Sequence, residues 1–346
     1  MSTSVSGLKD AFLHLSKWCG LFALARFVTR KKVRILCYHG FATGDEVRFR
    51  PGLFITPVTF EKRLETLRSH GYQVVSLSSA LASLDRGSPG DRTTVITVDD
   101  GFHGFNAHAV QLLQAFAMPV TVYVTTYYAV KQTPVFRLVV QYMLWKTTRD
   151  SIDLGLVGSS LSGTASLRDV DARSRAAWQI IAFGESQPSE EARLSIERRL
   201  GELLGVDFDG IVSARTFSLM TPEEIRILAR GACDVQLHTH RHRLPESEEE
   251  IKLEIRDNRC VLEPLVGAKL DHLCYPSGIW SRTLWPWLTS LGIRSATTCD
   301  AGLNDSTTPR LGLKRILDAE DVSQIGFEAE ISGFKDFFRR FKPEKP

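Results

Sequence analysis

The sequence predicts an α/β fold built on a parallel sheet, and three observations favour this class. Strand-like and helix-like stretches alternate along residues 33–135 and again along residues 221–299. Residues 94–98 are rich in β-branched side chains, which is typical of an interior parallel strand. This strand leads into Asp99 and Asp100, and α/β barrels carry their chemistry at the C-terminal ends of such strands.

Length, charge and cysteine content narrow the class of protein. The 346 residues suffice for one large domain with an insertion or for two ordinary domains, and the formal net charge of +3 gives no reason to expect nucleic acid as a partner. The six cysteines are widely spaced without a CxxC pair, which favours free thiols over a zinc module or a disulfide framework. The sequence shows no apolar run of about 18 residues and no secretion signal at its start, so we expect a cytoplasmic location.

The first 30 residues are predicted to form an amphipathic helix ahead of a domain that spans residues 31–346. Apolar residues recur at helical spacing through residues 7–30, and Lys31, Lys32 and Arg34 follow. The apolar face either packs against the domain or lies on an anionic membrane surface. Packing is favoured, because amphipathic helices in soluble proteins mostly cover a core. Membrane contact would make the protein peripheral to the inner membrane.

The first half of the domain then alternates strands and helices. A strand at 33–39 ends in His39, and a helix over 59–70 is entered through Thr56 and Pro57. Further strands are expected at 72–77, 94–98 and 119–126, with a helix over 106–116 between the last two. From about 135 to 218 the alternation weakens, and this segment is predicted to be a helical insertion within the domain.

The alternation resumes after the insertion. We expect helices over 221–230, 247–265 and 280–290, and strands over 233–240, 272–276 and 293–299. The strand at 233–240 carries histidines at its end, so it resembles the strand before Asp99 in delivering polar groups to one edge of the sheet.

A metal site is the most specific chemistry that the residues suggest. His238 and His242 can reach one ion whether the backbone is helical or turns after a strand, and Thr239 between them excludes the zincin signature. Two imidazoles and one carboxylate leave positions open for water and substrate, as catalytic metals require. Asp99 and Asp100 can both face the site only if the chain turns at Gly101. One carboxylate would then bind the metal and the other would accept a proton. The alternatives are a solvated histidine turn and a plain Asp-Gly turn.

Several motifs occur together in a fixed order: LCYHG, TVDDG, HTHRH and CYPSG. In this order they resemble the polysaccharide deacetylase family with the NodB-homology domain, also called carbohydrate esterase family four. The likeness covers roughly residues 33–318 and includes EIRDNRCVLEPLVG and LGLKRI. It implies a distorted (β/α)7 barrel, similar to a TIM barrel, in a bacterial protein that hydrolyses the N-acetyl group of amino sugars at one divalent metal ion.

The resemblance also implies roles for individual residues. Asp100, His238 and His242 correspond to the metal ligands and Asp99 to the general base, whereas His240 matches no ligand position. The groove motif corresponds to Tyr275, Pro276 and Ser277, where a backbone amide helps to hold the oxyanion. Zinc is the default ion, and nickel, cobalt or iron would also suit these ligands.

Two features depart from the pattern of the family. Cys274 and Ser277 stand where the family often has an arginine and an aromatic residue, and no histidine follows His272 to act as the general acid. His39 is the candidate acid, because it ends the first strand and would face the same rim as Asp99. A comparable Tyr-His pair occurs in members that resemble the biofilm-polysaccharide deacetylases.

The predicted function is therefore metal-dependent removal of N-acetyl groups from the amino sugars of a polysaccharide or glycan precursor, with a carbohydrate as the partner. Two other functions stay open. One is a deformylase or deacetylase of a lipid-linked sugar, which a membrane-binding N-terminus would favour. The other is a non-catalytic glycan-binding member of the family, which the two departures would favour. The sequence contains no signal for an oligomeric state.

Overall fold

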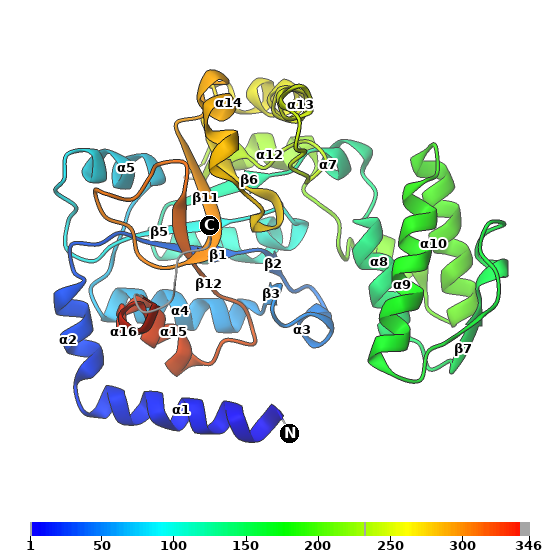
Figure 1. Cartoon of the computed structure of the whole chain (residues 1–346), viewed down its shortest axis with the longest axis horizontal. Helices are drawn as coiled ribbons and strands as arrows, with labels where there is room; N and C mark the ends of the chain where they lie inside the picture. The colour runs from blue at the N-terminus through cyan, green and yellow to red at the C-terminus, as the bar shows by residue number, and fades with distance from the viewer. Residues whose placement is uncertain (1, 232, 340–346) are drawn as a thin grey trace. The chain divides into compact units, whose positions relative to one another are not determined.

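The computed structural model describes residues 2–231 and 233–339 (Figure 1). The chain forms two compact units. The larger unit contains the chain up to residue 42, residues 46–126 and the chain from residue 222 onward, and the smaller unit contains residues 43–45 and 127–221. The functional residues that the sequence predicts all lie in the larger unit.

Seven parallel strands close into a barrel in the larger unit. Their order around the barrel is β1-β12-β11-β10-β9-β6-β5, and β5 pairs back to β1 with Leu36 opposite Ile96. This closed ring confirms the (β/α)7 barrel that the family resemblance implied. The strands are β1 (Arg34–Tyr38), β5 (Thr93–Val98), β6 (Val120–Val124), β9 (Cys233–Leu237), β10 (His272–Cys274), β11 (Ser295–Ala301) and β12 (Leu313–Leu317).

Several strands of the barrel are buried on both faces. Every residue of β1, β5 and β6 is buried, because one face of each strand meets the covering helices and the other meets the barrel interior. The strand predicted at 72–77 is much shorter. Only β4 (Gln73–Val74) forms there, and it pairs with the first two residues of β5. The rest of that stretch leads into α5 (Leu77–Asp85), which the sequence analysis did not predict.

Helices cover the outside of the barrel. In the view of Figure 1, α4, α15 and α16 lie on one side of it and α12, α13 and α14 on the other. The Oγ1 atom of Thr56 accepts a hydrogen bond from the Thr59 amide and so caps α4 where the sequence predicted its start. The remaining elements of this unit are α3 (Glu46–Phe49), α4 (Pro57–Ser69), η1 (Phe105–Ala109), α6 (Val110–Ala115), α12 (Pro222–Ala229), α13 (Glu248–Val266), η3 (Pro276–Gly278), η4 (Arg282–Leu284), α14 (Trp285–Ser290), α15 (Gln324–Ile331), α16 (Phe334–Arg339), β2 (Gly40–Phe41) and β3 (Phe54–Ile55).

The smaller unit is mainly helical and has its own core. Buried side chains of its three longest helices, among them Met143, Ile181 and Leu200, make up this core. The segment predicted to be a helical insertion, residues 135–218, lies within this unit. Its elements are α7 (Tyr127–Lys131), α8 (Phe136–Lys146), β7 (Ser151–Asp153), η2 (Leu154–Leu156), β8 (Thr164–Ser166), α9 (Val170–Glu185), α10 (Glu190–Leu204) and α11 (Phe208–Ser213).

The N-terminal segment forms two helices where the sequence predicted one. These are α1 (Ser2–Trp18) and α2 (Leu21–Val28), separated at Gly20, whose φ of 77° is left-handed and interrupts the helix. By length and apolarity, no single helix of the described chain could cross a membrane, whereas Gly7–Trp18 and Leu21–Val28 meet that test as a pair bent by 73°. All six cysteines are free thiols, as predicted.

Candidate metal and catalytic site

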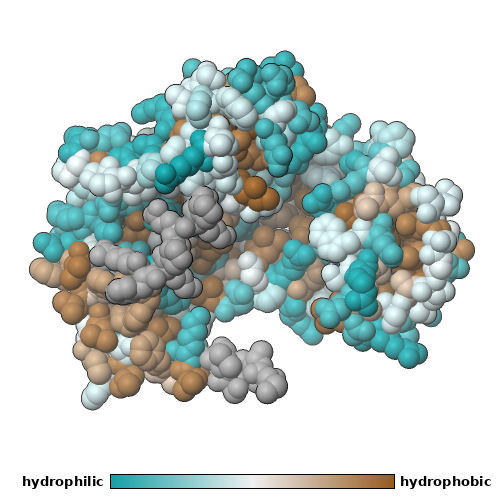
Figure 2. Space-filling model, in the orientation of Figure 1, coloured by the Kyte–Doolittle hydropathy of each residue, from teal (hydrophilic) through white to brown (hydrophobic). Residues whose placement is uncertain are grey.

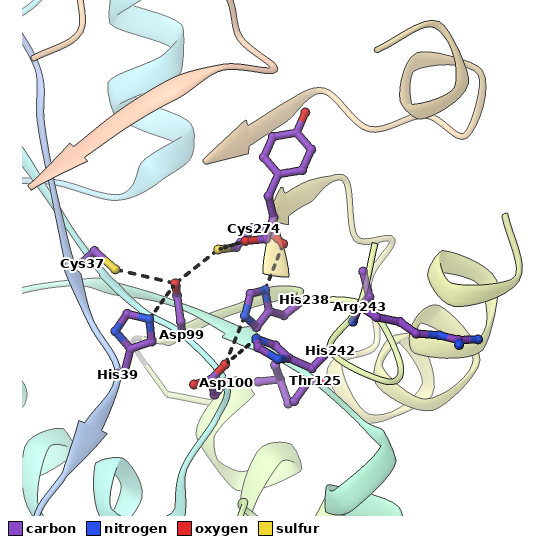
Figure 3. A network of polar contacts seen from close by, with 12 residues as sticks. Cys37, His39, Asp99, Asp100, Thr125, His238, His242, Arg243 and Cys274 are labelled. Atoms are coloured by element: carbon purple, nitrogen blue, oxygen red, sulfur yellow. Dashed lines mark hydrogen bonds and ion pairs between the residues drawn. The ribbon is translucent and has the colours of Figure 1, made fainter. Parts of the chain in front are cut away.

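Polar residues gather at the C-terminal ends of four barrel strands. His39 follows β1, Asp99 and Asp100 follow β5, His238 follows β9 and Tyr275 follows β10. Because all the strands are parallel, these ends meet at one rim of the barrel. Figure 3 shows His39 and Asp99 on one side of this group, with Asp100 and His238 beside them.

Three of the predicted residues converge on a single point. The Nε2 atoms of His238 and His242 each lie 3.2 Å from the Oδ1 atom of Asp100. An ion bound tetrahedrally at about 2.0 Å separates its ligand atoms by about 3.3 Å. The described residues hold two other groupings with ligand-like spacing, and both include Asp99. Asp99 is already engaged by an arginine, so Asp100, His238 and His242 are the set that best fits a divalent ion.

A left-handed turn at the end of β5 allows the two adjacent carboxylates to serve one site. Asp100 has φ of 68° and Gly101 has φ of 84°. In an extended strand the two aspartates would point to opposite faces. The turn instead leaves Asp99 directed into the barrel and Asp100 toward the rim. The second histidine also depends on unusual backbone, since Thr239 and His242 have φ of 61° and 52°.

Buried hydrogen bonds hold the ring and backbone of His238. Its Nδ1 atom lies 2.9 Å from the Cys274 carbonyl oxygen and donates to it, which leaves the Nε2 lone pair directed at the proposed ion position. The His238 amide donates to the side-chain oxygen of Asn258 on α13. The Asn258 amide group donates in turn to Val124 O and Thr126 Oγ1. Asn258 therefore ties the end of β9 to the end of β6, a role that the sequence analysis missed.

The third histidine of the motif points elsewhere. The Nδ1 atom of His240 lies 2.8 Å from Thr126 Oγ1, and the His240 carbonyl accepts a hydrogen bond from the Thr125 hydroxyl. This geometry agrees with the prediction that His240 matches no ligand position. Its contacts hold the turn that carries His238 and His242.

Asp99 is bound by a buried arginine from the last strand of the barrel. Arg315 on β12 donates from Nη1 to Oδ1 and from Nη2 to Oδ2, both at 2.7 Å, and its side chain is fully buried. Burial alone would raise the pKa of Asp99, but the charge and hydrogen bonds of Arg315 outweigh it and hold that pKa well below its usual range. Asp99 is thus an ionised carboxylate in a fixed orientation.

Arg315 supplies a cation to Asp99 although residue 274, where the family often has an arginine, is a cysteine. The Cys274 thiol lies 3.2 Å from Asp99 Oδ2 and 3.3 Å from Arg315 Nη2, and the Cys37 thiol lies 3.6 Å from the same carboxylate oxygen. The sequence analysis did not identify Arg315. The available signal was its position in the LGLKRI stretch, which was matched to the family without a role.

His39 stands beside the carboxylate of Asp99. Its Nε2 atom lies 3.6 Å from Asp99 Oδ2, and its side chain is 22% exposed, so solvent and substrate can reach it. Burial lowers the pKa of His39, and the nearby carboxylates of Asp99 and Asp100 only partly offset this effect. The ring is therefore neutral near pH 7.

The groove motif exposes only one of its three residues. Tyr275 and Pro276 are buried, and Tyr275 donates its hydroxyl to Leu311 O and its amide to Thr297 O. Ser277 is exposed and has φ of 56°. Within this motif the molecular surface is therefore formed by Ser277 rather than by the tyrosine ring.

Comparisons with known proteins agree with this architecture. The family model described as polysaccharide deacetylase matches residues 209–296, a segment that contains His238 and His242. A search of curated proteins found no match.

Among solved structures, the deacetylase PplD of Streptococcus pyogenes in complex with acetate has a TM-score of 0.56 at 16% identity, over 87% of this chain and 98% of that chain. IcaB from Ammonifex degensii has a TM-score of 0.54 at 18% identity, over 87% and 97% of the two chains. A de-N-acetylase from Aggregatibacter actinomycetemcomitans has a TM-score of 0.52 at 12% identity, over 86% and 98%. At these identities the similarity to the solved structures concerns the fold. The family match and the barrel together confirm the resemblance to polysaccharide deacetylases that the motifs indicated.

Proposed function

We propose that this chain, which resembles the polysaccharide deacetylases in its motifs and its barrel, is a metal-dependent hydrolase that removes N-acetyl groups from the amino sugars of a polysaccharide or glycan precursor. One observation carries the proposal. The Nε2 atoms of His238 and His242 meet Asp100 Oδ1 at equal distances of 3.2 Å, beside an ionised Asp99. The family match and the structural neighbours support deacetylation of glycans as the general activity.

The residues divide the work between binding and proton transfer. A divalent ion held by Asp100, His238 and His242 would supply Lewis-acid chemistry to the acyl group, and imidazole and carboxylate ligands suit zinc first, then nickel, cobalt or iron. Asp99 accepts the proton of the attacking water, because its carboxylate is ionised and adjoins the ligand set.

The oxyanion and the leaving nitrogen require two further donors. In the groove motif the amide of Tyr275 is bonded to Thr297 and Pro276 has no N–H, so the amide of Ser277 is the donor that a substrate oxygen can reach. His39 lies 3.6 Å from Asp99, close enough to receive the proton that Asp99 has taken. It then donates this proton to the departing nitrogen, which leaves a free amine and acetate.

The test combines metal analysis with acetate release. We expect the purified chain to bind one divalent ion and to release acetate from N-acetylglucosamine oligomers. A double variant, Asp100→Ala with His238→Ala, should lose both the ion and the activity. His240→Ala is the matched control, because its ring contacts Thr126 rather than Asp100, and it should keep the ion.

Two results would count against this function. A wild-type chain that binds no divalent ion after incubation with zinc, nickel, cobalt or iron would remove the mechanism. A chain that binds the ion and the oligomers but releases no acetate from them would be a glycan-binding protein rather than an enzyme.

A further inference from the structure

The two N-terminal helices carry an apolar face that the rest of the chain leaves uncovered. The described chain has nineteen exposed large apolar side chains, and eight of them lie between residues 8 and 28. Trp18 is 84% exposed and Leu8 75%, and Leu15 and Leu24 are each 58% exposed. Figure 2 shows hydrophobic surface gathered over α1 and α2. Such a concentration marks an interaction surface, whereas single exposed apolar residues do not.

The opposite face of the same helices is packed. Leu13, Phe22 and Ala25 are buried in one cluster with Ile325 and other apolar residues of α15 and α16. This cluster fixes α1 and α2 to the larger unit, as the packing alternative predicted. It leaves an outer stripe, which runs through Leu8, Leu15 and Trp18 at helical spacing, exposed in the described chain, while Phe12 at its edge also contacts Phe334.

The charge of the segment indicates the kind of partner. Residues 7–32 contain six lysines and arginines and a single acidic residue, Asp10. Lys17, Lys31 and Lys32 form ion pairs with acidic residues of the larger unit, so the basic excess rests on the other three, Lys9, Arg26 and Arg30. The Asp10 carboxylate accepts a hydrogen bond from the Ser323 hydroxyl, on the packed side of the helix. An exposed apolar stripe with basic residues around it is complementary to a bilayer with anionic headgroups. A second copy of the same basic face would meet it with like charge.

We propose that α1 and α2 bind the surface of a bilayer that contains anionic phospholipids, with the outer stripe placed at the boundary between headgroups and acyl chains. The 73° bend, fixed by the cluster on the inner face, holds the two helices as one preformed surface. Trp18 and Phe27, the latter 63% exposed, are aromatic residues of the kind enriched at this boundary. This surface makes no use of the metal site, so its test is independent of the proposed activity.

Vesicle flotation of the full chain tests the proposal. We expect the protein to float with vesicles of phosphatidylglycerol and phosphatidylcholine in equal parts, to float less with phosphatidylcholine alone, and to be released as salt rises. Because the transfer of one large apolar side chain is worth roughly tenfold in affinity, the triple variant Leu15→Ser, Trp18→Ser and Leu24→Ser should bind at least about a hundredfold more weakly.

A matched control removes an equal number of exposed apolar side chains elsewhere. Val58, Val170 and Ile227 are 62%, 81% and 60% exposed, and their replacement by serine should leave flotation unchanged. Circular dichroism of both triple variants checks that they are folded. The proposal is overturned if the wild type floats with neither vesicle, or if the two triple variants float equally. It is also overturned if the wild type sediments as a dimer without binding lipid while the first triple variant sediments as a monomer, since a second copy would then cover the face.

Discussion

The pair formed by Arg315 and Asp99 is expected to stabilise the barrel as well as the site. Arg315→Met removes the cation from two contacts of 2.7 Å and leaves the Asp99 carboxylate buried without a charge partner. Removing one member of a buried ion pair typically costs about 3–5 kcal/mol. Because both contacts are short and the guanidinium is fully buried, we expect a loss of about 4 kcal/mol in the free energy of unfolding. Asp99→Asn should cost a similar amount, since it leaves the guanidinium unpaired.

The double variant separates this pair from other effects of each substitution. Arg315→Met combined with Asp99→Asn should cost about 2–3 kcal/mol less than the sum of the two single losses. The assay is urea-dependent hydrogen exchange at the amides of β5 and β12, which reports on the barrel rather than on the smaller unit. All samples are treated with a chelator, so that metal release does not enter the comparison. Single losses that add to within about 0.5 kcal/mol would refute the argument.

The same pair should control catalysis through the orientation of the base. Arg315→Lys keeps the positive charge but loses the bidentate hydrogen bonding to Asp99. We therefore expect kcat to fall about 10–100-fold with little change in KM. Arg259→Lys is the matched control, because that guanidinium binds the carbonyls of Leu270 and Leu291 away from the site. It should leave kcat unchanged. A full kcat in Arg315→Lys would mean that the orientation of Asp99 is set by other contacts.

Three further predictions concern single residues. His39→Gln should lower kcat by about 10²–10⁴ while metal content stays at the wild-type level, and loss of the metal would instead place His39 among the ligands. Asn258→Ala should weaken zinc binding about 10–100-fold in a competition titration, because His238 loses its support, and an unchanged affinity would contradict that role. In the smaller unit, burial, followed by the charge of Glu190, raises the pKa of Glu197 from 4.5 to about 8. The folded state therefore binds this proton more tightly than the unfolded state, and the contribution to stability is full below pH 4.5 and lost as the pH rises to about 8. Glu197→Gln should stabilise the smaller unit by about 3 kcal/mol near pH 9 and hardly at all near pH 4, and thermal unfolding with the same gain at both pH values would refute the assignment.

The sequence was sufficient to predict the fold class and to identify the polar residues at the ends of the strands. The two histidines and the aspartate pair lie in short motifs, so their types and local spacing indicate a metal site, and the family resemblance assigned Asp100 rather than Asp99 to the ligand set. The position of His39 could be predicted for a related reason. In a parallel barrel all strand ends share one rim, so a residue that ends β1 must face a residue that ends β5.

Contacts between distant strands could not be predicted in this way. Arg315 and Asp99 are 216 residues apart, and their contact exists only because the ring of strands closes between β1 and β5. Asn258 acts through a side chain that leaves a helix and meets two strand ends, which no helical periodicity reveals. Gly20 is a weak point in a helix, but a single helix was predicted through it because the apolar spacing continues across it. The same spacing identified the amphipathic segment but could not say which of its faces would be covered.

Position 274 carries a cysteine where the family often has an arginine, and Arg315 binds Asp99 instead. The closed barrel explains how one residue can serve for the other. Residue 274 ends β10 and residue 315 lies in β12, yet the Cys274 thiol and the Arg315 guanidinium approach within 3.3 Å at the same carboxylate. The two side chains therefore contact the same buried carboxylate and each other. An arginine at 274 would collide with Arg315, and a small thiol there leaves the space that Arg315 fills. The departure at residue 274 thus moves the arginine to another strand of the same barrel while the carboxylate keeps its cation, and for this reason the departure does not argue against catalysis.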